Sequence, residues 1–361
     1  MTYDYSSTID RLATIGLPTS PEDLMPESVP GNHESFTLRK MTVEHPEFHR
    51  AIREIAHIHR RYQDQQLAEG LMIYGQSGAG KTTLIEFYLQ QFRPRRVLGM
   101  MVIPVLYVIT PVAPTIKMLA EAFLIAMGCP ASSKGTTAEK LERIISFLET
   151  CHVQLIVIDE FQHFFEGRRS ANARQVSDWL KNLLSRSGRP VILVGLPKSI
   201  SVLNENPQLR RRFAAPFYLE PFGYLTSTQQ GLFRALLRRL QNRLPFPCVD
   251  LSTGEMARCF YYASMGLIDY VIKILDHVGS RGGSGPGRLI TQTDLALAFR
   301  RAIWDACPDE LNPFVPGANL RRLTQKNEPF DGWEDPDQYT MSSRAKGLKK
   351  SVQQQQEPSH A

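Results

Sequence analysis

The sequence predicts an α/β fold: a three-layer core in which a parallel sheet of five strands carries helices on both faces, followed by a small all-helical domain. Two observations support this prediction. Up to about residue 225, short runs of aliphatic and β-branched residues alternate with segments of helical periodicity. Such runs are typical of strands buried on both faces, and their alternation with helices indicates a parallel sheet. Beyond residue 226 the periodicity is helical only.

The expected elements follow one another at short intervals. A helix over residues 44–67 leads straight into the first strand, because its apolar residues recur on one helical stripe. Thr136 and Glu139 form a capping box that opens a later helix of the core. The expected strands are 71–74, 102–110, 155–158, 191–194 and 217–219. The expected helices between them and after them are 84–92, 114–127, 136–148, 174–187, 227–242, 252–264, 266–279 and 293–306.

This pattern divides the chain into four parts. Residues 1–40 contain several prolines and little periodicity, so we expect a tail or docking arm. Residues 41–225 are expected to be the core, and residues 226–307 the helical domain. Residues 308–361 are rich in proline, asparagine and glutamine, so we expect a flexible C-terminal tail.

Composition narrows the class of protein. The five cysteines are scattered and form no C-x-x-C pair, which argues against a disulfide framework or a zinc knuckle and favours a reducing cytoplasm. The N-terminus has no basic start followed by an apolar run, so no secretion signal is expected. Three prolines interrupt the apolar stretch 97–116, so we expect a buried strand and helix there and no membrane span. A net charge of +6 is compatible with binding a polyanion.

The most informative motif is a complete phosphate loop, G-x-x-x-x-G-K-[ST], directly after the first expected strand. Glycines let the backbone turn its N–H groups toward an anion, and the positive end of the following helix adds to the field. In such a loop the lysine reaches the β and γ phosphates of ATP, and the hydroxyl of Thr82 ligates Mg²⁺. The predicted nucleotide-binding residues are Gly75, Gln76, Ser77, Gly78, Ala79, Gly80, Lys81, Thr82 and Thr83.

A second motif places two carboxylates at the same edge of the sheet. The strand 155–158 ends in Asp159 and Glu160, beside the expected position of the phosphate loop. We predict that Asp159 holds Mg²⁺ through water, and that Glu160 orients and polarises an attacking water. The alternative is that the pair only caps the next helix.

Three consecutive arginines precede the fifth expected strand. A charge run of this kind is usually a solvated helix face. Its position before a strand of the core instead allows an arginine to reach the nucleotide of a neighbouring subunit and to neutralise charge on the γ phosphate. We favour Arg212 over Arg211 for this role in trans.

The phosphate loop, the Asp159–Glu160 pair, the arginine segment and the helical domain together resemble the AAA+ ATPases over about residues 44–306. More narrowly, Asp159 to Phe164, Val194 to Pro197, Gln208 to Phe213 and Gly266 to Ile268 resemble the TniB and TnsC family of transposition regulators, some of which serve CRISPR-associated elements.

The resemblance implies a function and partners. Members of that family assemble on duplex DNA with ATP, recruit and activate a transposase of the integrase type, and receive target information from a TniQ-like protein. It implies that this chain self-associates into a ring or filament around DNA. For the DNA contacts we single out Lys117, at the start of the helix after the second strand, and Arg168, in the loop after the carboxylates. Either residue is equally compatible with a solvated surface.

The sequence departs from the AAA+ pattern at two places. Val194 and Gly195 stand where many of these proteins have a polar sensor residue, and the segment 266–270 lacks the arginine often found in the helical domain. Slow hydrolysis that acts as a timing switch is therefore expected. Two alternative functions remain open: a replication initiator or helicase loader, and a nucleotide-gated signalling switch that binds no DNA.

Overall fold

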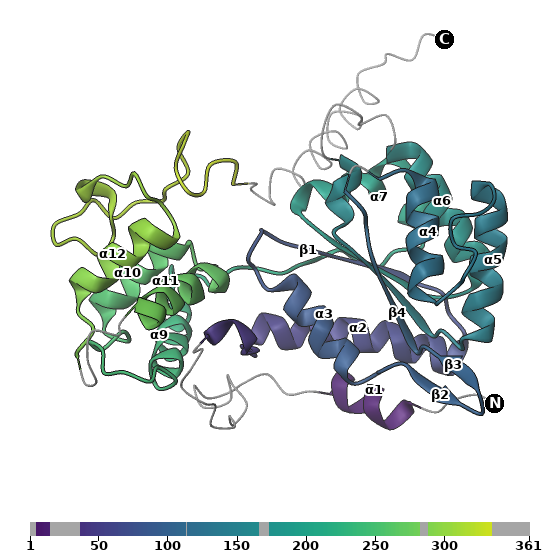
Figure 1. Cartoon of the computed structure of the whole chain (residues 1–361), viewed down its shortest axis with the longest axis horizontal. Helices are drawn as coiled ribbons and strands as arrows, with labels where there is room; N and C mark the ends of the chain where they lie inside the picture. The colour runs from purple at the N-terminus through teal and green to yellow at the C-terminus, as the bar shows by residue number, and fades with distance from the viewer. Residues whose placement is uncertain (1–4, 15–36, 113, 166–172, 282–287, 334–361) are drawn as a thin grey trace, which may run out of the picture.

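The computed structural model describes residues 5–14, 37–112, 114–165, 173–281 and 288–333. It confirms the predicted fold class, a three-layer α/β core with a helical region after it (Figure 1).

A parallel sheet of five strands forms the centre of the core. Tyr74 pairs with Gly195, and Ile109 pairs with Asp159, so neighbouring strands end together at one edge of the sheet. Groups that follow these strands are therefore carried to the same carboxyl edge. The strand order is β4 (Val105–Ile109), β5 (Leu155–Asp159), β6 (Val191–Gly195), β1 (Gly70–Tyr74) and β7 (Phe217–Tyr218).

Helices cover both faces of the sheet, because successive side chains of a strand point to opposite sides. In β1, Leu71 and Ile73 belong to the hydrophobic cluster under α2 (Pro46–Gln65) and α3 (Lys81–Gln90). Met72 and Tyr74 of the same strand belong to the cluster on the other face. The helices over that face are α4 (Ile116–Ala126), α5 (Thr137–Thr150) and α6 (Ala173–Ser187) (Figure 1).

The expected strand at 102–110 is shorter in the structure and follows a hairpin that the sequence pattern does not indicate. Pro104 has no N–H for a strand ladder, so β4 begins only after it. Before it, β2 (Arg95–Val97) pairs antiparallel with β3 (Met100–Val102). Leu98 and Gly99 join them with φ of 51° and 82°, as a two-residue hairpin turn requires.

The helical region follows β7 in the predicted order. The helices of the region are α9 (Ser227–Gln241), α10 (Gly254–Ser264), α11 (Ile268–Arg281) and α12 (Gln292–Ala302). Its apolar residues belong to the same continuous hydrophobic cluster as those under α2 and α3, and α11 contacts the segment 38–40.

In the core, three short helices connect β6 to β7. They are η5 (Pro197–Ile200), α7 (Ser201–Glu205) and α8 (Pro207–Arg210).

The expected N-terminal tail needs a correction where it is described. Helix α1 (Ser6–Ala13) packs on α2 through the buried residues Ile9 and Leu12. The turn η2 (Leu38–Lys40) is held to α11, where Asp276 accepts hydrogen bonds from the Thr37 hydroxyl and the Leu38 N–H, both at 2.7 Å. The rest of the expected docking arm lies outside the described residues.

The expected flexible C-terminal tail also needs a correction over residues 308–333. After η6 (Asp309–Leu311), Phe314, Leu323 and Phe330 are buried in the cluster shared with α10 to α12. Asn312 supports this packing by donating a 2.9 Å hydrogen bond to the carbonyl of Ala296. Residues 334–361 lie outside the described part, and the boundaries of the four predicted parts stay predictions.

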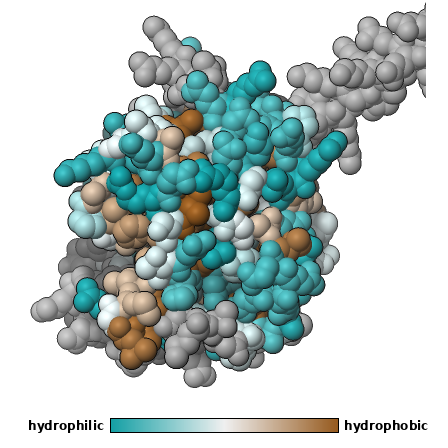
Figure 2. All heavy atoms as spheres, turned by 90° about the vertical axis from the view of Figure 1, so that its right-hand side faces the viewer, coloured by the Kyte–Doolittle hydropathy of each residue, from teal (hydrophilic) through white to brown (hydrophobic). Residues whose placement is uncertain are grey.

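Two properties concern contact with apolar surroundings. Over the described ranges, no helix has both the length and the apolar character that a bilayer span requires. The end of the core seen in Figure 2 is mostly hydrophilic, and hydrophobic residues appear there as separate spots.

Candidate functional site

The loop between β1 and α3 has the backbone of an anion cradle. Gly78 and Gly80 adopt φ of 80° and 89°, which side-chain-bearing residues rarely do, and Gly80 is the N-cap of α3. Gly75 is needed for space, since a Cβ there would lie 2.8 Å from the carbonyl oxygen of Leu219. The loop therefore presents backbone N–H groups at a helix N-terminus.

Lys81 is the first residue of α3, and its ammonium group is held inside the loop. Nζ donates hydrogen bonds of 2.8 Å to the carbonyls of both Gly75 and Gln76. Burial lowers the pKa of Lys81 to about 8, and the carboxylates of Asp159 and Glu160 act in the opposite direction. A positive charge that is partly desolvated and close to N–H donors is suited to phosphate.

Asp159 ends β5 and is almost completely buried. Its Oδ2 accepts a 2.9 Å hydrogen bond from the Tyr107 hydroxyl and lies 3.4 Å from Oγ1 of Thr82. Burial raises the pKa of Asp159, and the N–H of Glu160 and the Tyr107 hydroxyl oppose that shift. A carboxylate and a hydroxyl that meet beside a phosphate loop are oxygen donors of the kind Mg²⁺ prefers, so these residues fit the expected metal.

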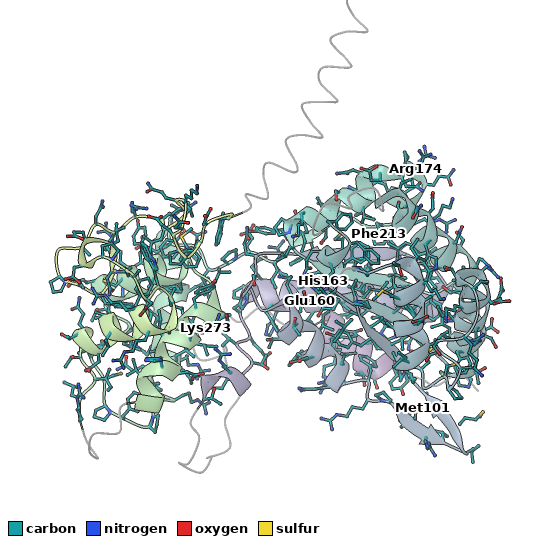
Figure 3. The ribbon with its side chains drawn as sticks, turned by 45° about the horizontal axis from the view of Figure 1, so that its top comes forward. Met101, Glu160, His163, Arg174, Phe213 and Lys273 are labelled. Carbon is teal, nitrogen blue, oxygen red and sulfur yellow. The ribbon has the colours of Figure 1, made fainter. Side chains whose placement is uncertain are left out.

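Glu160 follows with φ of 54°, a left-handed conformation that turns the chain sharply after the strand. Its side chain is 41% exposed, so the carboxylate is accessible to water. His163 lies beside it, with Nε2 4.0 Å from Oε2 of Glu160 and Nδ1 donating to the carbonyl of Thr110 (Figure 3). The pair does more than cap the next element, the 3-10 helix η3 (Phe161–Phe165), because Oδ2 of Asp159 faces Tyr107 and Thr82.

Gln162 is a site residue that the sequence analysis missed. It is buried, its Nε2 donates to the Glu160 carboxylate, and its Oε1 accepts a 3.2 Å hydrogen bond from the Leu196 N–H. Its position two residues after Glu160 was the available signal, but a contact with the end of β6 cannot be read from spacing.

A cavity of about 470 Å³ opens onto the phosphate loop. Its walls come from the loop, from the segment after η2, and from the start of α11. Apolar side chains in its lining make it suitable for a flat heterocyclic ring. These side chains are Met41, Val43, Phe48, Ile268 and Ile272.

The start of α11 brings a carboxylate to the cavity. Asp269 lines it, and its N–H lies 3.4 Å from the carbonyl oxygen of Gly78. Lys273, one turn further, forms a 2.7 Å ion pair with Asp269 and lies 4.7 Å from the centre of the Tyr270 ring. The segment 266–270 has no arginine. The nearest lysine along α11, Lys273, does not take its place, because it is already paired with Asp269.

The predicted arginines lie away from the loop of their own chain. Arg211 and Arg212 are exposed after α8, which Asn206 caps by accepting from the N–H groups of Gln208 and Leu209. The carbonyl of Arg212 accepts a hydrogen bond from the N–H of Gly70, at the opposite end of β1 from the loop. Five residues of strand span roughly 16 Å. The structure therefore does not bring either arginine to Lys81 of the same chain.

The two predicted DNA contacts are only partly described. Lys117 is exposed at the start of α4, on the carboxyl side of the sheet. Arg168 lies outside the described residues.

The comparisons with known proteins agree with this geometry. The model of one family, described as the bacterial TniB protein, matches residues 35–224, which include the loop, Asp159 and both arginines. A comparison with curated proteins finds no match.

Solved structures share the fold. The ORC2 protein of Aeropyrum pernix, in ADPNP-ADP complexes, is 19% identical, with a TM-score of 0.51 over 77% of this chain and 74% of that chain. The ORC1 protein of Aeropyrum pernix, in complex with DNA, is 17% identical, with a TM-score of 0.50 over 77% and 68%. CDC6P from Pyrobaculum aerophilum is 13% identical, with a TM-score of 0.51 over 82% and 74%. At these identities the likeness shows the AAA+ fold alone.

Proposed function

The chain belongs to the TniB family and has the AAA+ fold, and from this premise we propose that it is a DNA-binding ATPase that regulates transposition. The observation that carries the proposal is the meeting of Lys81, Thr82, Asp159 and Glu160 at one sheet edge, within the segment that the family model matches. The structural neighbours in complex with ADPNP-ADP and with DNA support the choice of ligands.

ATP would bind with its phosphates in the loop and its base in the apolar part of the cavity. The backbone N–H groups and Lys81 neutralise the β and γ phosphates. Thr82 and Asp159 would hold Mg²⁺, which supplies further neutralisation of the phosphate charge when bound. Glu160, accessible to water and next to the loop, orients and polarises the water that attacks the γ phosphate.

Self-association completes the site in this proposal. Arg211 and Arg212 cannot reach the phosphates of their own chain, but they are exposed and available to a neighbouring copy. A head-to-tail contact that uses two different surfaces produces rings or filaments. We propose that Arg212 acts in trans within such an assembly around duplex DNA, that hydrolysis is slow, and that it releases the assembly.

The partners follow from the family. We propose that the DNA-bound assembly recruits and activates a transposase of the integrase type and receives target information from a TniQ-like protein. A net charge of +6 favours the phosphate backbone of DNA, and Lys117 is the proposed contact among the described residues. Arg168 is proposed as a second contact.

A second candidate is a replication initiator or helicase loader, which the likeness to ORC1 in complex with DNA favours. Both candidates assemble on DNA with ATP, so DNA binding does not separate them. Stimulation of a transposase by the ATP-bound protein does separate them. A signalling switch without DNA binding is the third candidate.

The decisive experiment measures fluorescence anisotropy of a labelled duplex with a non-hydrolysable ATP analogue, followed by electron microscopy. We expect tight binding with the analogue, weak binding without it, and a steep loss of affinity with salt. Lys81→Ala should abolish both the assembly on DNA and ATP hydrolysis. Lys326→Ala, which changes an exposed lysine that does not line the cavity, is the control. Assembly and hydrolysis that survive Lys81→Ala would refute the proposal.

The DNA contact has its own test. Lys117→Ala should weaken binding similarly for all sequences and lower the slope of log affinity against log salt by about 0.9 for each phosphate that the lysine neutralised. Lys134→Ala, beyond the far end of α4, should change neither quantity. An unchanged slope in Lys117→Ala removes that residue from the DNA interface.

A further inference from the structure

The end of β6 has no room for a side chain. A Cβ on Gly195 would lie 2.5 Å from Oγ of Ser199 and 3.1 Å from Oε1 of Gln162. The φ of Gly195 is not in the left-handed region, so the glycine is required by the space that its neighbours occupy and not by its backbone conformation. The space that a side chain of residue 195 would take is occupied by Ser199 and by a group from another element.

That group is the amide of Gln162, from η3. Its Oε1 accepts from the Leu196 N–H, so its Nε2 must face the Glu160 carboxylate. The opposite orientation would set the amide oxygen against the carboxylate oxygens and the amide NH₂ against an N–H. The hydrogen-bond network thus fixes which end of the amide faces Glu160.

The same strand end is connected to the phosphate loop. The carbonyl of Gly195 accepts a 3.2 Å hydrogen bond from the N–H of Gly75, the first residue of the loop. Gln162 and Leu196 both line the cavity that opens onto the loop. Glu160, Gln162, the end of β6 and the phosphate loop therefore form one continuous chain of hydrogen bonds.

We propose that Gln162 is a positioning residue for ATP hydrolysis: it holds the Glu160 carboxylate in place and ties it to the end of β6. This inference rests on the proposed ATPase function. Without the amide, Glu160 is a partly exposed side chain on a left-handed residue, free to sample other rotamers. A displacement of about 1 Å in a catalytic group is enough to cost up to about 10²-fold in rate.

The test separates positioning from binding. Gln162→Met keeps the length of the side chain and removes both hydrogen bonds. We expect kcat to fall at least about tenfold, with the Kd for a non-hydrolysable ATP analogue within about twofold of wild type. Gly195→Ala, whose Cβ would crowd Oγ of Ser199 and, less tightly, the Gln162 amide, should also lower kcat. Gln90→Ala, an exposed glutamine at the end of α3, should change neither quantity.

A double-variant cycle tests the route of the effect. If Gln162 acts through Glu160, then adding Gln162→Met to Glu160→Gln should lower kcat by no more than about twofold further. Full additivity, an unchanged kcat in Gln162→Met, or a parallel loss of nucleotide binding would each overturn the inference. Wild-type protein that neither binds nor hydrolyses ATP would overturn the proposed function itself, whereas normal turnover that survives Gln162→Met overturns only the role of Gln162.

Discussion

At the scale of single residues, the position of the Lys81 ammonium group is already fixed by hydrogen bonds within the phosphate loop. The two carbonyls that hold Nζ lie at the start of the loop, so the ammonium group is kept close to the N–H groups that face a phosphate. The cost is partial desolvation, which lowers the pKa of Lys81 to about 8. A triphosphate nearby favours the charged form again, so binding and protonation are linked.

This linkage predicts the pH dependence of ATP binding. Below about pH 8 Lys81 already carries its proton, so affinity should change little with pH. Above that pH, binding must take up a proton, and affinity should fall by at most about tenfold per pH unit. Titrations of a fluorescent ATP analogue between about pH 7.5 and 9.5 measure this, in a range where the triphosphate is fully ionised. Lys81→Arg, which stays protonated, should lose the slope, and a constant wild-type Kd would contradict the prediction.

Residues differ in how far the sequence alone predicts their place. The phosphate loop is a contiguous motif, and parallel strands end at one edge, so the proximity of Asp159 to Thr82 could be predicted from the sequence. The contact of Tyr107 with Asp159 could not, because it depends on the register between β4 and β5. Gln162 could not be predicted either, because its contact with Leu196 depends on how η3 lies beside the end of β6.

At the scale of elements, α2 and α3 meet over a buried histidine. His59 Nε2 faces Oε1 of Gln154 at 3.1 Å, and this oxygen also accepts from Gln63, so Nε2 carries the proton. Nδ1 then accepts from the Tyr88 hydroxyl at 2.9 Å. Burial lowers the pKa of His59 to about 4, which the hydrogen bond to Gln154 only partly offsets.

His59 should therefore make the fold sensitive to acid. The unfolded chain binds a proton near pH 6.5 and the folded chain only near pH 4, so the stability from a neutral His59 is lost as pH falls through this window. Between pH 7 and pH 5 the free energy of unfolding should drop by about 2 kcal/mol more in wild type than in His59→Gln. Urea unfolding at both pH values measures it. Equal losses in the two proteins would exclude His59 as the source.

The C-terminal segment 308–333 is packed against the helical region, although its Pro-, Asn- and Gln-rich composition is that of a flexible tail. Within it, three widely spaced apolar residues are buried against the helical region. Phe314 is fully buried, with its ring 4.9 Å from that of Phe260, and Phe330 lies 4.9 Å from Tyr270 at the start of α11. Such sparse anchors show no period of their own, so the sequence pattern could not reveal them.

Two truncations test this correction. Ending the chain after residue 307 removes Phe314 and Phe330 and should lower Tm strongly, since losing one buried Phe side chain already costs about 3–5 kcal/mol. Ending it after residue 333 should leave Tm and ATP binding unchanged. Thermal unfolding of both variants measures the difference, and equal Tm values would contradict the packing role.

At the scale of the whole molecule, the nucleotide cavity is assembled from distant parts of the chain. Asp276 of α11 binds Thr37 and Leu38, which are 239 and 238 residues away, and so fixes the segment that carries Met41 and Val43 into the cavity wall. Local patterns predict each wall separately, but the closure of the cavity depends on these long-range bonds. The helical region is thereby part of the nucleotide site.

Arg211 and Arg212 do not reach the phosphate loop of their own chain, and the whole-molecule prediction concerns whether one of them serves a neighbouring copy. A Glu160→Gln copy should bind ATP and assemble without hydrolysing it, and it keeps Arg212, whereas an Arg212→Ala copy keeps its own Glu160. If the arginine acts in trans, mixing the two inactive proteins should restore hydrolysis wherever an intact Glu160 faces an intact arginine.

In an equal random mixture on DNA, about a quarter of the head-to-tail contacts meet this condition, so turnover should recover to about a quarter of the wild-type rate. Steady-state ATPase assays of each variant alone and of the mixture measure it, with the double variant Glu160→Gln, Arg212→Ala as the partner that cannot rescue. Repeating the mixture with Arg211→Ala decides between the two arginines, because only the one that touches the γ phosphate gives an inactive variant that Glu160→Gln rescues. An active Arg212→Ala protein would move the role to Arg211, and inactive variants that no mixture restores would place the arginines' effect within their own chain.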